Sequence, residues 1–394
     1  MDVTVADAPA EYDAYRDRLR TFVAAHVPTL EWAPRTGARM PESVADLEKL
    51  RDWVAALHDA GYILARFRED AADPFEQRIL ETELAGTGIP YILGNPLVSG
   101  ALKAFGTPEQ RRRYLPPMAR GDHIWTQLFS EPDAGSDLTA LQTRAARDGD
   151  DYIVDGQKVW STWAPFADYG YLLARTEPDP GPRGITAFIL DMRSPGVETR
   201  PLREMTGTAD FSEVFFDGVR VPAANLIGAT GEGWKVANTS LAAERGGVGE
   251  LGSDDALRGL VRLARIRRQA GRPAIEDSAV RQQIAAYAAR ARIQRALGFR
   301  VATKAARGES EVWDAPLMKI WASELNLETV EYGLALQGPR SALSEDDPLV
   351  VDGGRWQDAF LYARALTIAG GSNEIMRNLI AERGLGLPRE PRGM

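Results

Sequence analysis

The sequence predicts a multidomain α+β protein in which a β-domain lies between two helical domains. Apolar residues recur at three- and four-residue steps up to about residue 120, which is the spacing of amphipathic helices. Turn signals and β-rich runs then dominate to about residue 228, and helical spacing returns after Gly231. We therefore predict an N-terminal α-helical domain over residues 1–120, a middle β-barrel or sandwich over residues 121–230 and a C-terminal helical bundle over residues 231–394.

The N-terminal third is predicted to be helical throughout. The apolar spacing favours helices over residues 12–23 and 44–57 and continues through residues 81–85. A further helix is expected to begin at Pro108, because Thr107 is a good N-cap and proline is favoured at the first helical position.

The middle of the chain alternates between β-rich runs and Asp-Gly pairs. The runs are Tyr152–Val154, Tyr169–Ala174, Ile185–Leu190 and Glu213–Phe216, and the pairs are Asp148-Gly149, Asp155-Gly156 and Asp217-Gly218. An Asp-Gly pair between β-rich runs is a hairpin signal, so we predict a tight turn at each of the three pairs.

The last third reads as helical to its end. Helical spacing covers residues 234–244, 278–306 and 316–332. After a predicted loop at residues 344–354, two short helices at residues 360–367 and 373–383 flank a glycine-rich turn.

Composition narrows the class of protein. The chain has 394 residues, 44% of them hydrophobic and 26% charged, so it can bury a large core. It has no cysteine and three well-separated histidines, so neither a disulfide nor a metal site is expected. A net charge of −9 argues against nucleic acid as the main partner. We see no signal segment and no apolar stretch of about twenty residues, and expect a cytoplasmic protein without a membrane partner.

Two segments of the middle domain carry the strongest functional signal. Phe-Ser-Glu-Pro-Asp-Ala-Gly-Ser-Asp at residues 129–137 offers hydroxyls and backbone amides without bulk. Asp-Gly-Gln-Lys-Val-Trp-Ser-Thr at residues 155–162 places an indole and a hydroxyl two residues apart on one strand, and so on one face. Such a face could cover a planar cofactor. The same residues also fit a polar hairpin loop and a tryptophan that fills a core.

Taken together, the two segments resemble the flavin-binding signatures of acyl-CoA dehydrogenases. The first is similar to Thr/Ser-Glu-Pro-x-Ala-Gly-Ser-Asp and the second to Gly-x-Lys-x-Trp-x-Thr. The predicted order of domains is also that of the family, in which the C-terminal domain is a four-helix bundle. The resemblance spans about residues 40–390 and implies an FAD-dependent oxidoreductase of acyl-CoA metabolism.

The resemblance also implies which residues bind the cofactor. Gln127, Leu128 and Ser130 are expected to line the flavin ring. Trp160, Ser161 and Thr162 are expected on its other side, with Thr162 near N5. Ser136 is expected near both the flavin and the CoA moiety, and Arg267 near the FAD pyrophosphate of a neighbouring subunit, with Arg265 and Arg268 close by. The implied cofactor-binding residues are Gln127, Leu128, Ser130, Ser136, Trp160, Ser161, Thr162, Arg267, Ser372 and Glu374.

The catalytic base requires a choice within the family. Many relatives carry a glutamate in a C-terminal motif, but Gly370 stands at that position here. A second branch, which includes isovaleryl-CoA dehydrogenase, uses a glutamate directly before an arginine on an earlier helix, and Glu244-Arg245 matches it. We expect Glu244 to be the base, Arg245 to steady the substrate pocket and the Gly370 N–H to bind the thioester oxygen. Glu374 is a second candidate base, and Glu244 can alternatively be a solvated helix residue.

The implied partners are an acyl-CoA substrate and an electron-transferring flavoprotein as electron acceptor. The adenine-side motif of the family is blurred at residues 334–340, so a homodimer, a homotetramer and one half of a heteromer all stay open. A flavin oxidase or monooxygenase on the same fold is an alternative activity. A catalytically silent partner subunit is the alternative from another class. The acyl group is not fixed by the sequence.

Overall fold

The computed structural model describes residues 9–30, 40–41, 43–70, 72–178, 181–248, 253–269, 271–343 and 347–389. These residues fold into two compact units, an N-terminal unit that ends at Ser240 and a C-terminal unit that continues from Leu241. Helix α6 (Gly233–Val248) begins in the first unit and ends in the second. The domain boundaries predicted at residues 120 and 230 stay predictions.

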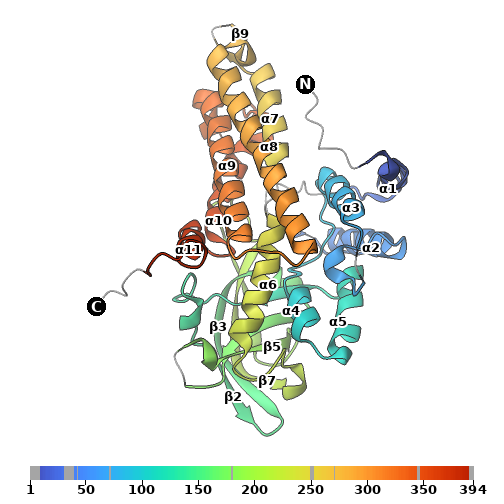
Figure 1. Cartoon of the computed structure of the whole chain (residues 1–394), viewed down its shortest axis with the longest axis vertical. Coiled ribbons are helices and arrows are strands. Elements are labelled where there is room, and N and C mark those ends of the chain that lie inside the picture. The colour runs from blue at the N-terminus through green and yellow to red at the C-terminus, as the bar shows by residue number, and fades with distance from the viewer. Residues whose placement is uncertain are drawn as a thin grey trace. The chain divides into compact units, whose positions relative to one another are not determined.

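Helices precede the sheet in the N-terminal unit, as the apolar spacing predicts (Figure 1). They are α1 (Asp13–His26), α2 (Val44–Asp59), α3 (Pro74–Gly86), α4 (Val98–Phe105) and α5 (Pro108–Arg120). The predicted start at Pro108 is confirmed: the Thr107 side chain accepts from the Gln110 N–H, and the Gln110 side chain accepts from the Thr107 N–H. Helix α1 packs against α3, and α2 against α5.

Among the described residues, a sheet of seven strands forms the rest of the N-terminal unit, with strand order β1-β4-β2-β3-β7-β6 and β5 beside β4. Strand β1 runs parallel to β4, and the pairs β2–β3, β3–β7, β6–β7 and β4–β5 are antiparallel. The strands are β1 (Trp125–Leu128), β2 (Arg144–Asp148), β3 (Asp151–Thr162), β4 (Tyr169–Arg175), β5 (Ile185–Asp191), β6 (Val197–Leu202) and β7 (Phe211–Pro222).

Two of the three predicted turns in this sheet are wrong. The pair Asp148-Gly149 does form the β2–β3 hairpin. However, Asp155-Gly156 lies inside β3 and Asp217-Gly218 inside β7, where the register of the two strands shifts. Gly156 and Gly218 have φ of +146° and +62°, and the Gly218 N–H donates to Asp155 Oδ1 at 2.8 Å. A β-bulge uses the same left-handed backbone as a tight turn, so the residue types alone could not separate the two.

The C-terminal unit is a bundle of long helices, seen as the extended yellow-to-red group in Figure 1. Helix α9 packs against α7, α8 and α10, and Gly333 of α9 allows close contact because a Cβ there would stand 2.1 Å from the Trp356 ring. The predicted helix over residues 278–306 is α8, and the predicted loop over residues 344–354 includes three residues outside the described ones. The helices are α7 (Ser253–Ile266), α8 (Ser278–Ala306), α9 (Asp314–Gln337), α10 (Arg355–Ile368) and α11 (Asn373–Leu379).

A buried ion pair joins the loop after β1 to strand β3. Lys158 of β3 is completely buried, and its Nζ donates to Glu131 Oε1 at 2.7 Å and to the Phe129 carbonyl at 2.9 Å. Glu131 is 8% exposed and accepts from the backbone N–H of Gln142 at 2.6 Å and of Thr143 at 2.9 Å. Both charges therefore have hydrogen-bond partners, as buried charges require.

The pKa values of this pair reflect burial opposed by attraction. Burial lowers the pKa of Lys158 to about 8, although the Glu131 charge acts against the shift. Burial raises the pKa of Glu131, but Lys158 and the hydrogen-bond donors Thr143 and Gln142 outweigh burial, so the pKa is lowered overall. The Glu131 contribution to stability is thus present above its ordinary pKa and is lost as the pH falls through the folded value.

We predict that Lys158→Met and Glu131→Gln each lower the free energy of unfolding by about 3–5 kcal/mol, because each leaves the other group buried without its partner. The double variant should regain most of this loss, since no unpaired charge remains. Urea unfolding followed by tryptophan fluorescence measures the effect. Arg200→Ala, which removes an exposed ion pair with Glu198, is the control. Single variants as stable as this control would contradict the prediction.

Candidate functional site

The structure brings the two signature segments together at the ends of β1 and β3. Strands β1 and β3 contact each other, and the Val159 N–H donates to the Ser130 carbonyl at 2.9 Å. The Glu131–Lys158 pair fixes the same junction from inside. Gln127 and Ser130 therefore lie on the chain directly beside the segment that carries Trp160 and Thr162.

Trp160 has an unusual backbone and an open side chain. Its φ is +60°, the residue is 59% exposed, and its ring meets the Phe211 ring edge-on with 6.0 Å between the ring centroids. The residue sits where the β3–β7 register shifts between Lys158 and Ser161. A left-handed tryptophan costs about 1–3 kcal/mol and persists only where its surroundings enforce it. The exposure excludes the alternative in which this tryptophan fills a core.

The neighbouring polar groups suit a planar ligand with a hydrogen-bonding edge. Thr162 is half-buried, and the Ser161 hydroxyl is buried with no hydrogen-bond partner among the described residues. The Gln127 Oε1 accepts from Asn95 Nδ2 at 3.0 Å, which fixes the orientation of that amide. An exposed indole beside these groups fits the ring end of a flavin.

Two other predicted cofactor residues differ in their surroundings. Leu128 is completely buried in the sheet. Ser136 is exposed in the loop that follows β1. The structure gives neither residue a further feature that points to a ligand.

In the C-terminal unit, Gly370 and Ser372 lie in the turn between α10 and α11, and Glu374 lies in the first turn of α11. Gly370 is left-handed with φ of +67°, and Ser372 caps α11 by accepting from the Ile375 N–H at 3.3 Å. Glu374 is exposed, and hydrogen bonds from its own backbone N–H and from Ser372 lower its pKa, with a smaller effect of Arg377. A carboxylate with a lowered pKa is a poor proton acceptor near neutral pH.

Arg267 lies beside the blurred adenine-side segment. It follows α7, it is half-buried, and its Nε donates to the Leu336 carbonyl at 3.4 Å. Its Nη2 lies 3.6 Å from the point where a Cβ at Gly338 would stand. Arg267 and the adenine-side segment are about seventy residues apart in the sequence, and they thus meet at one place in the bundle.

The expected base lies on a helix whose side chains are only partly described. Glu244 and Arg245 belong to α6, which is helical through Val248. The side chains of both residues lie outside the part of the chain that the structure describes. Their roles stay predictions.

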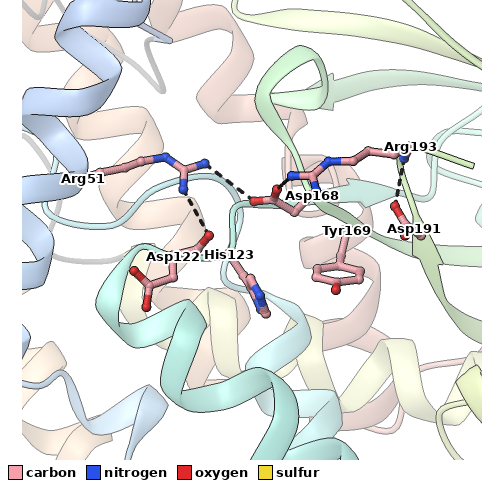
Figure 2. A pocket seen from close by; sticks show the side chains of 7 residues that line it. All are labelled: Arg51, Asp122, His123, Asp168, Tyr169, Asp191 and Arg193. Atoms are coloured by element: carbon pink, nitrogen blue, oxygen red, sulfur yellow. Dashed lines mark hydrogen bonds and ion pairs between the residues drawn. The ribbon is translucent and has the colours of Figure 1, made fainter.

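A separate polar cavity of about 310 Å³ lies elsewhere in the N-terminal unit (Figure 2). Asp168 lies among its charges: it accepts from the Ile124 N–H at 2.9 Å, forms an ion pair with Arg193, and has Arg51 Nη2 at 3.7 Å. The two guanidinium groups are thus already directed at one buried carboxylate. None of the residues predicted to bind the cofactor lines this cavity, whose walls are Arg51, Asp122, His123, Asp168, Tyr169, Asp191 and Arg193.

The described residues contain no group of three or more histidine, cysteine, aspartate or glutamate side chains placed to hold a metal ion. No helix within the described ranges has the length and apolarity needed to cross a bilayer.

Family models of acyl-CoA dehydrogenases match most of the chain. The N-terminal domain model matches residues 9–122, the middle domain model residues 126–219 and the C-terminal domain model residues 231–385. A curated relative, the acyl-CoA dehydrogenase IpdE1 of Mycobacterium tuberculosis, is 38% identical over 76% of this chain and 76% of its own length.

Solved structures agree with the family models. The Tcur3481–Tcur3483 steroid ACAD has a TM-score of 0.84 at 27% identity, over 98% of this chain and 100% of the matched chain. The ChsE4–ChsE5 complex from Mycobacterium tuberculosis has a TM-score of 0.82 at 29% identity, with coverage of 98% and 100%.

The chain belongs to the acyl-CoA dehydrogenase family. It is an FAD-dependent oxidoreductase of acyl-CoA metabolism, and the predicted fold class is confirmed, with helical N- and C-terminal domains around a curled middle sheet. Glu131 and Lys158 are the structural residues of the site that sequence reasoning missed. Both stand within the quoted signatures, so a search for opposite charges in the two segments could have found them.

We predict that His123, in the wall of the polar cavity, titrates below the ordinary histidine pKa of about 6.5. Burial lowers the pKa of this imidazole and outweighs Asp168 and Asp122, which raise it. Protonation is then harder in the folded chain than in the unfolded chain, so the His123 contribution to stability declines as the pH falls below the ordinary value. NMR of the imidazole carbon-bound protons against pH, assigned with His123→Gln, measures this. A pKa at or above the ordinary value would show that the prediction is wrong.

Proposed function

We propose that this acyl-CoA dehydrogenase oxidises an acyl-CoA thioester between its α and β carbons to the trans-2-enoyl-CoA, with Glu244 as the base. The observation that supports this best is the joined end of β1 and β3, where the open Trp160 indole stands beside Thr162. This arrangement suits the ring end of a flavin, and bound FAD supplies the hydride acceptor at flavin N5.

The chain's own residues hold the cofactor in this proposal. Gln127, Leu128 and Ser130 would hold the flavin ring together with Trp160, Ser161 and Thr162. Ser136, Ser372 and Glu374 would add further contacts. Arg267 would bind the FAD pyrophosphate of a neighbouring subunit, since a planar guanidinium matches a diphosphate with two parallel hydrogen bonds. Its position beside Leu336 and Gly338 supports this role.

Glu244 takes the α proton of the thioester. A base must have a pKa near the working pH, which a carboxylate reaches in a dry pocket. Glu131 and Glu374 do not meet this condition. The pKa of Glu131 is lowered in its ion pair with Lys158, and the pKa of exposed Glu374 is lowered by its own backbone N–H and Ser372. These shifts favour Glu244 over Glu374.

Two further residues act on the substrate. As the proton leaves, negative charge develops on the thioester oxygen, and the Gly370 N–H donates to it. Backbone donors directed at developing charge are worth about 2.7–4 kcal/mol each in acyl-transfer sites. Arg245, next to the base, steadies the pocket electrostatically.

The proposal also includes an electron acceptor and an oligomeric state. The electrons pass on to an electron-transferring flavoprotein, and the chain works as a homo-oligomer or as one half of a heteromer. The titles of two similar structures name a two-component steroid ACAD and a two-protein complex, which supports testing a heteromer and a steroid acyl-CoA.

Two alternatives give different results when the chain is purified alone. A silent partner subunit would be colourless and inactive. A flavin oxidase or monooxygenase would be reoxidised rapidly by air after reduction. The proposal expects bound FAD, bleaching by an acyl-CoA without oxygen and slow reoxidation by air. A panel of linear, branched, ring-bearing and steroid acyl-CoAs identifies the acyl group.

We predict that Glu244→Gln retains FAD but slows anaerobic flavin reduction about 10²–10⁴-fold, because general base catalysis contributes that much. Stopped-flow absorbance with the best acyl-CoA of the panel measures the rate.

Glu374→Gln is the matched control, since it removes the second candidate base. A variant at Glu374 that loses reduction while Glu244→Gln keeps it would exchange the two roles and refute the assignment. Normal reduction in both variants would refute the proposed base chemistry.

We predict that Thr162→Val slows flavin reduction about tenfold while FAD stays bound, because it removes one hydrogen bond near N5 worth about 1–1.5 kcal/mol. Thr162→Ser keeps the hydroxyl and is expected to react at close to the wild-type rate. Bound FAD is measured from the absorbance of the purified protein. Equal rates in Thr162→Val and wild type would remove Thr162 from the site.

A further inference from the structure

A buried lysine of α9 holds both ends of the turn that carries Gly370. Lys319 is 1% exposed. Its Nζ donates to the Thr367 carbonyl, in the last turn of α10, at 3.0 Å and to Asn373 Oδ1, in the first residue of α11, at 2.7 Å. Burying an ammonium group costs several kcal/mol of folding free energy unless hydrogen bonds compensate. A buried lysine bonded to both ends of one turn therefore suggests a role for its charge there.

Two adjacent glycines form the turn. Gly370 and Gly371 both lie in the left-handed region, with φ of +67° and +95°. Two adjacent glycines have the widest choice of backbone conformations, so fixing them costs more entropy than fixing other residues. A Cβ at Gly370 would meet no atom within 4 Å, so there is open space beside that position.

Asn373 links the lysine to a wider network on α9. Its Oδ1 also accepts from Ser323 Oγ at 3.1 Å, and its Nδ2 donates to Glu324 Oε1 at 3.4 Å. Glu324 in turn pairs with Arg377 of α11. Lys319, Ser323 and Glu324 therefore form one surface of α9 that orients the residue after the glycine turn.

We propose that Lys319 is a positioning residue for catalysis: its ammonium fixes the Gly370–Ser372 turn and places a positive charge beneath it, which favours the negative charge that develops on the thioester oxygen. The inference rests on the proposed function, in which the Gly370 N–H binds that oxygen. Lys319 acts through the turn and does not contact the substrate.

The test uses a substrate analogue that stops after proton removal. In a 3-thia-acyl-CoA, sulfur replaces the β carbon, so the α proton can leave to the base but no hydride can follow. The resulting enolate, stacked on oxidised flavin, absorbs at long wavelength. The acyl chain is that of the best substrate in the panel, and the pH midpoint of the absorbance reports how well the site stabilises the enolate.

Lys319→Met is expected to keep FAD and to raise this pH midpoint by about one unit, a tenfold loss of enolate at fixed pH, because a nearby positive charge is removed. Lys319→Arg keeps the charge and should restore the midpoint at least partly. Ser323→Ala removes a contact of Asn373 but leaves the ammonium. It should shift the pH midpoint by less than about half a unit, which is a threefold change in enolate at fixed pH. A role in stability alone would lower the unfolding temperature and leave the midpoint unchanged.

The outcomes separate this inference from the proposed function. If the wild type shows no long-wavelength absorbance with any analogue, the proposed function fails. If the wild type shows it and Lys319→Met has the same midpoint, the role of Lys319 is refuted. If Lys319→Met does not fold, Lys319→Gln, whose amide can still donate, takes its place. Failure of both to fold would make Lys319 a folding residue and overturn the proposal.

Discussion

The ion pair between Glu131 and Lys158 is the constraint on which the flavin side of the site depends. A carboxylate in the loop after β1 and an ammonium in β3 are both buried, so each needs the other and the backbone groups around it. The pair forces the loop and the strand to stay in contact, and the Val159 N–H then reaches the Ser130 carbonyl. If Gln127, Ser130 and Thr162 moved apart, Glu131 and Lys158 would separate and each buried charge would lose its partner. This explains physically why both signature segments carry a charged residue.

The irregularities of β3 have a related cause. A strand with perfect alternation would carry its side chains on two faces at fixed intervals. Here the register shifts at Gly156 and again before Ser161, and Trp160 takes a left-handed backbone that leaves its indole open. A bulge re-aims side chains at the cost of local pairing. The strand therefore leaves regular geometry at the residues that the family signature marks, and the buried pair at Lys158 holds it there.

The fold class was predictable because it depends on patterns that are local in the chain. Apolar spacing gave α8 over residues 278–306, and a Thr-Pro pair gave the start of α5. The Asp-Gly pairs misled at Gly156 and Gly218, since a positive φ is required by bulges and turns alike. Strands β2 and β6 are polar and were missed. In the site, the signatures located residues along the chain, but only pairing across strands shows that Leu128 is buried or that Arg267 meets Leu336. Contacts of this kind depend on tertiary packing, which local patterns do not encode.

The proposed position of the base and the charge of Lys319 beside the glycine turn are mutually consistent. The Lys319 ammonium donates to residues at both ends of the turn that carries Gly370, and a nearby cation lowers the pKa of a carboxylate. The pKa of Glu374, in the first turn of α11, is lowered first by its own backbone N–H and Ser372 and further by Arg377 and Lys319. A turn that stabilises negative charge suits the thioester oxygen, which must gain charge, and suits a proton acceptor poorly. In the proposed function, the turn at Gly370 stabilises the oxygen while Glu244 of α6 removes the proton.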